Sequence, residues 1–145
     1  MTNYTYITVD EVQRVCKELE ISDWTRITSG KIVNAEANII RNITGGEALK
    51  LPLEQFQHGL EIELEHGIQF PDANVTNNHP VLTGRIVLAH LKEGLDYYLR
   101  LECMELEMEL YKAIAKKDSN KSSTIRRELA ECRTSLESAL ATALG

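Results

Sequence analysis

The sequence has 145 residues, of which 43% are hydrophobic and 26% are charged, a composition typical of one globular domain rather than of a disordered chain. Its formal net charge of -6 argues against sequence-independent binding to nucleic acid, which requires a basic surface. No apolar run approaches the roughly 20 residues of a membrane span, and the polar N-terminus lacks a secretory signal, so we expect a cytoplasmic protein without membrane contact.

The first predicted helix covers residues 8–20. Thr8 is its expected N-cap, and Glu11, three residues later, completes the capping-box pattern. We expect the turn that follows, residues 21–24, to fold the only tryptophan of the chain back against this helix.

Residues 25–50 show weak periodicity, and glycines interrupt a segment that is rich in isoleucine. We expect a short helix over residues 31–43. Because β-branched residues have reduced helix propensity, a short strand, a hairpin or an irregular segment is the alternative within residues 25–50.

The next predicted helix opens with Pro52 and extends to His66, and Gly67 stands where a left-handed C-cap is common. The connection over residues 68–81 is rich in proline, asparagine, aspartate and threonine, which are typical of turns and helix caps. Ordered connections of this length are often functional.

The longest predicted helix extends from residue 82 or 83 to residue 117, with leucines that recur at spacings of three, four or seven. A polar segment over residues 118–123 ends it. A last helix, capped by Ser122 or Ser123, is expected over residues 123–144, and its leucine spacing suits an antiparallel helical hairpin or an oligomer contact.

These elements predict an all-α fold, a small helical bundle with one long central helix and a C-terminal helical hairpin. We expect one domain over residues 1–145, with residues 123–144 as an assembly element. The three cysteines, Cys16, Cys103 and Cys132, form no Cys-x-x-Cys pair, so we expect them to be reduced and to pack as small hydrophobic residues.

The most specific chemical pattern consists of two carboxylate–histidine pairs. Glu63 and His66 are three residues apart, as are His90 and Glu93, so each pair projects from one face of its helix. Ferritin-like bundles use the Glu-x-x-His spacing at di-iron sites, and mixed imidazole and carboxylate ligands suit iron, manganese or zinc. The chain lacks the full ligand set of such a site, so hydrogen bonding or ion pairing between the helices is the alternative.

A second polar group follows in the sequence. Asp96 and Arg100 are spaced for a helical ion pair, and Tyr97 would lie on the face of His90 in an unbroken helix. Glu65 and Tyr98 complete this predicted polar core, in which the tyrosines either bind a partner or pack with their hydroxyls satisfied.

Two surfaces are candidates for contact with a partner protein, an acidic face of the long helix and a leucine seam of the last helix. The candidate residues are Glu102, Glu105 and Glu109 on the acidic face and Leu129, Leu136 and Leu140 on the seam.

Taken together, several segments between residues 53 and 107 resemble a family of small helical proteins of unknown function from bacteria, tailed phages and other large DNA viruses. These segments are Glu63-Leu64-Glu65-His66-Gly67, Asn74-Val75-Thr76, Pro80, Thr83-Gly84, Ala89-His90-Leu91, Glu93, Asp96-Tyr97-Tyr98, Arg100-Leu101 and Met104-Glu105. Against this family, residues 25–50 and the C-terminal helix look like additions. Leu95 stands where the family often has proline, which favours an unbroken helix at that position.

The resemblance implies a helical domain and a phage origin but no mechanism. We therefore expect an accessory protein of a phage or bacterium that has no catalysis of its own and binds a protein partner, itself as a homo-oligomer, or both. It would be a virion component or a modulator of a host process, located in the host cytoplasm or the virion. The alternative is a metal-binding protein, or a metal-dependent enzyme, built on the two carboxylate–histidine pairs.

Overall fold

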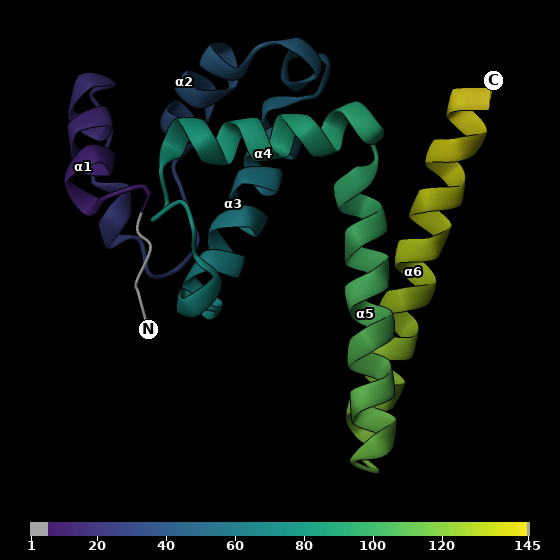
Figure 1. The fold of residues 1–145 in the computed structure, drawn as a ribbon. Helices are drawn as coiled ribbons and strands as arrows, with labels where there is room; N and C mark the ends of the chain where they lie inside the picture. The colour runs from purple at the N-terminus through teal and green to yellow at the C-terminus, as the bar shows by residue number, and fades with distance from the viewer. Residues whose placement is uncertain (1–5, 145) are drawn as a thin grey trace. The chain divides into compact units, whose positions relative to one another are not determined.

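The computed structural model describes residues 6–144, and in this range every regular element is helical (Figure 1). This confirms the all-α prediction, and no strand occurs in residues 25–50. The α-helices are α1 (Val9–Glu18), α2 (Asn34–Thr44), α3 (Leu53–Gln69), α4 (Pro80–Glu93), α5 (Tyr97–Ala115) and α6 (Ser119–Leu144). Short 3-10 helices cover Trp24–Arg26, Gly46–Lys50 and Pro71–Ala73.

The chain forms two compact units, one that ends at Glu93 and one that begins at Gly94. The first unit contains α1 to α4 and the second contains α5 and α6. Among the described residues, no helix is both long enough and apolar enough to span a membrane.

The N-terminal part of the first unit follows the predicted pattern. Thr8 caps α1 by accepting the backbone N–H of Glu11 at 3.2 Å. Trp24 is fully buried, and its indole Nε1 donates to Glu36 Oε2 of α2 at 2.8 Å. The same half-buried carboxylate accepts the backbone N–H of Ser22 at 2.8 Å, so Glu36 fixes the turn after α1 to the next helix.

Helix α2 confirms the helix predicted over residues 31–43, although it begins at Asn34 and ends at Thr44, and it packs closely on α4. Ala37 and Ile40 of α2 are fully buried. At Gly84 of α4, a Cβ atom would lie 2.5 Å from Thr44 Oγ1 and 2.8 Å from Ile40 Cγ2. Only glycine therefore permits this approach of the two helices.

The predicted end of α3 was wrong. Helix α3 continues through Gly67 to Gln69 instead of ending at His66. A Cβ atom at Gly67 would lie 2.9 Å from the side chain of Asn74, which explains the glycine by a tertiary contact rather than by a left-handed cap. The connection to α4 is correspondingly shorter than predicted.

The single long helix predicted up to residue 117 was also wrong. The helix ends at Glu93 and a new one begins at Tyr97, whose backbone N–H donates to the carbonyl of Gly94 at 3.0 Å. Glycine is about 1 kcal/mol less favourable than alanine within a helix, and here it lies at the break. Leu95 is 45% exposed between the two helices.

The predicted C-terminal hairpin is present, as α5 and α6 lie side by side (Figure 1). The predicted cap of α6 was wrong, because the helix begins at Ser119. Asp118 Oδ1 accepts the backbone N–H of Lys121 at 3.0 Å, whereas Ser122 lies inside the helix and donates its hydroxyl to the carbonyl of Asp118 at 2.7 Å.

A disulfide joins the two helices of this hairpin, between Cys103 of α5 and Cys132 of α6. Their Cα atoms are 5.7 Å apart, an ordinary separation for a disulfide. The prediction of three reduced cysteines was therefore wrong for two of them. Cys16 is free and buried, and burial raises the pKa of its thiol.

Candidate functional site

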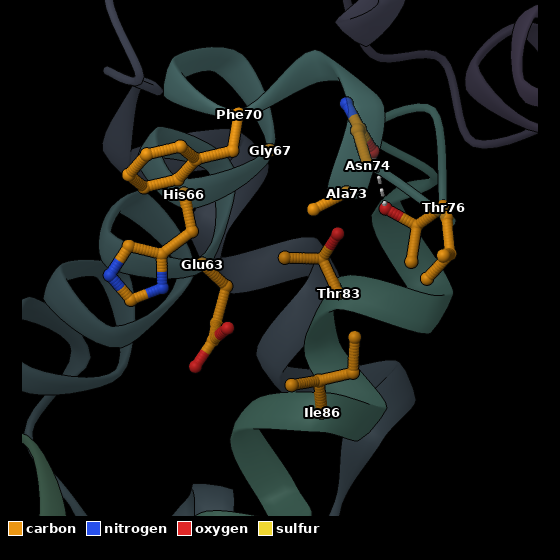
Figure 2. A pocket seen from close by; sticks show the side chains of 10 residues that line it. Glu63, His66, Gly67, Phe70, Ala73, Asn74, Thr76, Thr83 and Ile86 are labelled. Carbon is orange, nitrogen blue, oxygen red and sulfur yellow. Dashed lines mark hydrogen bonds between the residues drawn. The ribbon is translucent and has the colours of Figure 1, made fainter.

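A small open pocket lies between α3, the connection after it and α4 (Figure 2). Its volume is about 170 Å³. The lining combines polar and apolar side chains: Glu63, His66, Gly67, Phe70, Ala73, Asn74, Val75, Thr76, Thr83 and Ile86. In Figure 2, Glu63 and His66 project from α3 on one side, and Thr83 and Ile86 belong to α4.

Asparagines hold the connection that forms one wall of the pocket. Asn74 accepts the hydroxyl of Thr76 at 3.5 Å and donates to Asn78 Oδ1 at 3.2 Å. Asn78 in turn donates to the buried backbone carbonyl of Trp24 at 3.1 Å. Asn77 and Asn78 have positive φ angles of 47° and 62°, a conformation that asparagine tolerates better than most residues.

His79 fixes the start of α4, the helix that forms one side of the pocket. Its backbone carbonyl accepts the Thr83 hydroxyl at 2.8 Å, and its Nδ1 accepts the backbone N–H of Leu82 at 3.3 Å. The residue is only 8% exposed, and burial lowers the pKa of its imidazole. The neutral ring therefore acts as a cap for the helix.

The two predicted carboxylate–histidine pairs are partly brought together. His90 Nε2 lies 3.6 Å from Glu63 Oε1, and His90 Nδ1 lies 3.5 Å from Glu93 Oε2. Each ring nitrogen thus faces a different carboxylate, one from α3 and one from α4 itself. His66 lines the pocket beside Glu63. Within residues 6–144, no group of three or more His, Cys, Asp or Glu side chains is placed to hold a metal ion.

Glu65 is separate from these residues. It is exposed, and its side chain is the nearest neighbour of Gly30, whose absent Cβ would lie 3.2 Å from Glu65 Cγ. Its neighbour Glu61 binds Lys31 Nζ at 2.9 Å and accepts the backbone N–H of Ile32 at 3.3 Å. The glutamates of α3 therefore make contacts on more than one side of the helix: Glu61 with residues 31 and 32, and Glu63 with His90 of α4.

The other predicted polar residues belong to the second unit. Asp96 and Arg100 form the expected ion pair at 2.9 Å, and this hydrogen bond lowers the pKa of the Asp96 carboxyl. Tyr97 and Tyr98 pack edge to face with ring centroids 5.2 Å apart. Because the helix breaks after Glu93, Tyr97 does not share a helix face with His90.

The two predicted partner surfaces lie on the hairpin. Glu102, Glu105 and Glu109 are on α5, and Glu109 pairs with Lys112 at 3.3 Å and with Lys121 at 3.4 Å. Leu129 is buried in the core between α5 and α6, Leu136 is half-buried, and Leu140 is 38% exposed. The seam thus begins inside the hairpin and reaches the surface only towards its end.

Sequence reasoning missed the apolar part of the pocket. Phe70 and Val75 are 51% and 77% exposed, and Ile86 contributes from α4. The signal that could have revealed them is the presence of a large apolar residue within a polar, turn-forming connection. His79 and its capping role were missed too, because histidine is not among the usual N-cap residues.

Comparison with known proteins identifies a family for this chain, and that family has no described activity. No curated protein and no solved structure matches the chain. A family model does match, over residues 12–107, so the shared segment includes residues 25–50 and ends within α5. The chain belongs to the family described as "Protein of unknown function (DUF5661)".

Proposed function

We propose that this chain is a binding protein without catalysis of its own, and that its pocket receives a lysine or arginine side chain of a protein partner. The observation that carries the proposal is the lining of the pocket. Glu63 supplies a carboxylate that is only 15% exposed, and Thr76 and Asn74 supply oxygen atoms nearby. Exposed Phe70 and Val75 provide apolar surface for the partner next to these polar groups.

The size of the pocket supports a side chain as its occupant. Pockets for drug-sized ligands and cofactors measure roughly 300–1,000 Å³. At about 170 Å³ this pocket is smaller, and it is open to solvent. A single long side chain can enter such a site while its backbone stays on the surface.

The charge of the first unit supports a basic partner. The sequence up to Glu93 has 13 aspartates and glutamates against 8 lysines and arginines. An acidic surface of this kind increases the encounter rate with a basic partner and repels an acidic one. A guanidinium or ammonium group could then bind the partly buried Glu63 carboxylate, beside its contact with His90.

We place this binding activity in an accessory protein of a phage or of its bacterial host. The support for this is the resemblance of residues 53–107 to proteins of bacteria and large DNA viruses. The partner would be a component of the virion or a host protein whose activity is modulated in the cytoplasm.

Site-specific photo-crosslinking tests the proposal. A benzophenone side chain at position 75, next to the pocket, should form a covalent adduct with the partner in cells that naturally produce this protein. The matched control carries the same side chain at Val33, which is 61% exposed and does not line the pocket. Glu63→Gln in the position-75 protein should remove most of the adduct, while Glu54→Gln, an exposed change on the same helix, should leave it.

Mass spectrometry of the adduct identifies the partner peptide. The proposal requires a lysine or arginine beside the crosslinked residue, and replacement of that basic residue by alanine should reduce the adduct as Glu63→Gln does. Equal labelling from positions 75 and 33, or an adduct that persists with Glu63→Gln, would contradict it.

A further inference from the structure

One face of α5 is apolar and exposed. Met104, Met108 and Tyr111 are 51%, 46% and 65% exposed, and Ala115 is exposed at the end of the same line. These four residues, here called the methionine stripe, follow one another at spacings of four, three and four. This is the spacing of the a and d positions in a coiled coil, which is typical of a helix that packs lengthwise on another helix.

Helix α6 does not cover the methionine stripe. The side chains with which α5 packs on the core of the hairpin include Leu106 and Leu110. Each of these follows a stripe methionine, Met104 or Met108, by two positions, which is a rotation of about 200° around the helix. The stripe therefore faces away from the described part of α6.

Acidic and basic residues are unevenly distributed along α5. Glutamates occupy positions 102, 105, 107 and 109 of α5, and lysines follow at position 112, near its end, and at positions 116 and 117, just beyond it. A second copy of α5 in parallel orientation would place like charges together. A second copy in antiparallel orientation brings the glutamates of each helix towards the lysines at the end of the other, so the surface is complementary to itself.

We propose that the methionine stripe is the contact surface of a homodimer in which two α5 helices pack antiparallel. In the register that places Met108 opposite Tyr111 of the second copy, Met104 lies opposite the small Ala115. Twofold symmetry repeats both contacts, which gives four layers with a large residue in each.

The same register pairs the flanking charges. In an antiparallel coiled coil the e positions of the two helices meet, and here Glu105 and Lys112 occupy these positions. Each Glu105 then lies beside Lys112 of the other copy, and this contact occurs twice. Lys112 also contacts Glu109 of its own helix at 3.3 Å, an exposed contact that permits a change of partner at little cost.

Sedimentation equilibrium of the full chain, with its disulfide intact, tests the dimer. We expect a reversible monomer–dimer equilibrium for the unchanged protein. Met108→Glu should raise the dissociation constant at least about tenfold, because it places two charges in the contact. Its helix content by circular dichroism should stay the same, since Met108 is exposed in the hairpin.

Exchange of the two charges tests the orientation. Lys112→Glu and Glu105→Lys alone should each weaken the dimer about tenfold by creating two like-charge contacts. The double variant Glu105→Lys/Lys112→Glu should restore the affinity to within about threefold of the original, because the pairs reform with reversed sign. Arg127→Glu is the matched control. It makes the same change of charge as Lys112→Glu at an exposed position of α6, and it should have little effect on the dissociation constant.

A protein that stays monomeric at near-millimolar concentration would overturn the proposal and would leave the methionine stripe to a different partner. So would a dimer that is unchanged by Met108→Glu. A double variant that is as weak as either single variant would overturn the antiparallel pairing.

Discussion

Gly84 determines how closely α2 and α4 approach. Because a Cβ atom there would lie 2.5 Å from Thr44 Oγ1 and 2.8 Å from Ile40 Cγ2, an added methyl group forces the helices apart. We expect Gly84→Ala to lower the free energy of unfolding by about 1–3 kcal/mol, the usual cost of overpacking a core. Urea unfolding followed by the fluorescence of Trp24 measures this change.

Thr44→Ala provides the control, since it removes the atom that lies nearest to the added methyl group. Gly84→Ala should lower the free energy of unfolding by less in the Thr44→Ala background. A double-mutant cycle gives the coupling energy between the two sites. If Gly84→Ala is as stable as the unchanged protein, α2 and α4 do not approach as closely as described.

His79 makes the stability of the first unit depend on pH. Burial lowers the pKa of its imidazole, Arg14 and Arg85 act in the same direction, and Glu11 opposes them. The unfolded chain therefore binds the proton first as the pH falls. The neutral His79 ring contributes to the free energy of unfolding. This contribution is fully present above the unfolded pKa of about 6.5 and is lost as the pH falls through that value towards the lower folded pKa.

His79→Asn isolates this effect, because asparagine can cap α4 but does not titrate. The unchanged protein should lose more unfolding free energy between about pH 7.5 and about pH 5.5 than the variant does, as measured by urea unfolding at both values. An equal loss in the two proteins would show that His79 does not carry the dependence.

Gly67 shows why the role of a single residue was hard to predict from the sequence. A glycine near a helix end usually indicates a left-handed cap, but Gly67 is explained by Asn74, which packs where its side chain would be. That contact depends on how the connection folds back on α3, which no local spacing records. By contrast, the Thr8 cap and the Asp96–Arg100 pair are local, and both were predicted correctly.

At the level of elements, the disulfide between α5 and α6 is the strongest covalent constraint in the second unit. It closes a loop between positions 103 and 132, which are 29 residues apart. We expect reduction to lower the free energy of unfolding of the hairpin by about 2–4 kcal/mol, because the unfolded chain gains freedom. Urea unfolding followed by circular dichroism, with and without dithiothreitol, measures the effect.

The double variant Cys103→Ser/Cys132→Ser should unfold at the same urea concentration with or without dithiothreitol. Alkylation in denaturant without reductant should label Cys16 alone in the unchanged protein. If all three cysteines react under these conditions, the disulfide does not form in solution.

Apolar spacing predicted the helical hairpin well, but it was weak around the helix predicted over residues 31–43 and failed at the break after Glu93. Leucines recur at the same spacings on both sides of that break, so α4 and α5 together resemble one long helix. Spacing reports which residues share a face and not whether the backbone continues. Gly94 was the only local indication of the break.

For the whole molecule, the candidate site was predicted in part. The sequence pointed to Glu63, His66 and His90, and the structure places Glu63 between a pocket and the imidazole of His90. The pocket itself depends on Phe70 and Val75, which carry no chemical motif. A motif search identifies groups that can ionise or bind metal, but the shape of a cavity follows from the packing of α3 on α4.

The division into two units predicts that the first unit folds without the second. The segment up to Glu93 contains α1 to α4 and a core around Trp24, Phe56 and Leu60, all fully buried. Chains longer than about 60 residues can bury enough surface to fold alone. We therefore expect a fragment of residues 1–93 to unfold cooperatively in urea, with the blue-shifted emission of a buried indole before the transition.

In this fragment, Glu36→Ala should lower the free energy of unfolding by about 1–3 kcal/mol, because the indole N–H of Trp24 loses its acceptor. A fragment with the emission of exposed tryptophan and no cooperative transition would show that the first unit needs residues beyond Glu93 to fold.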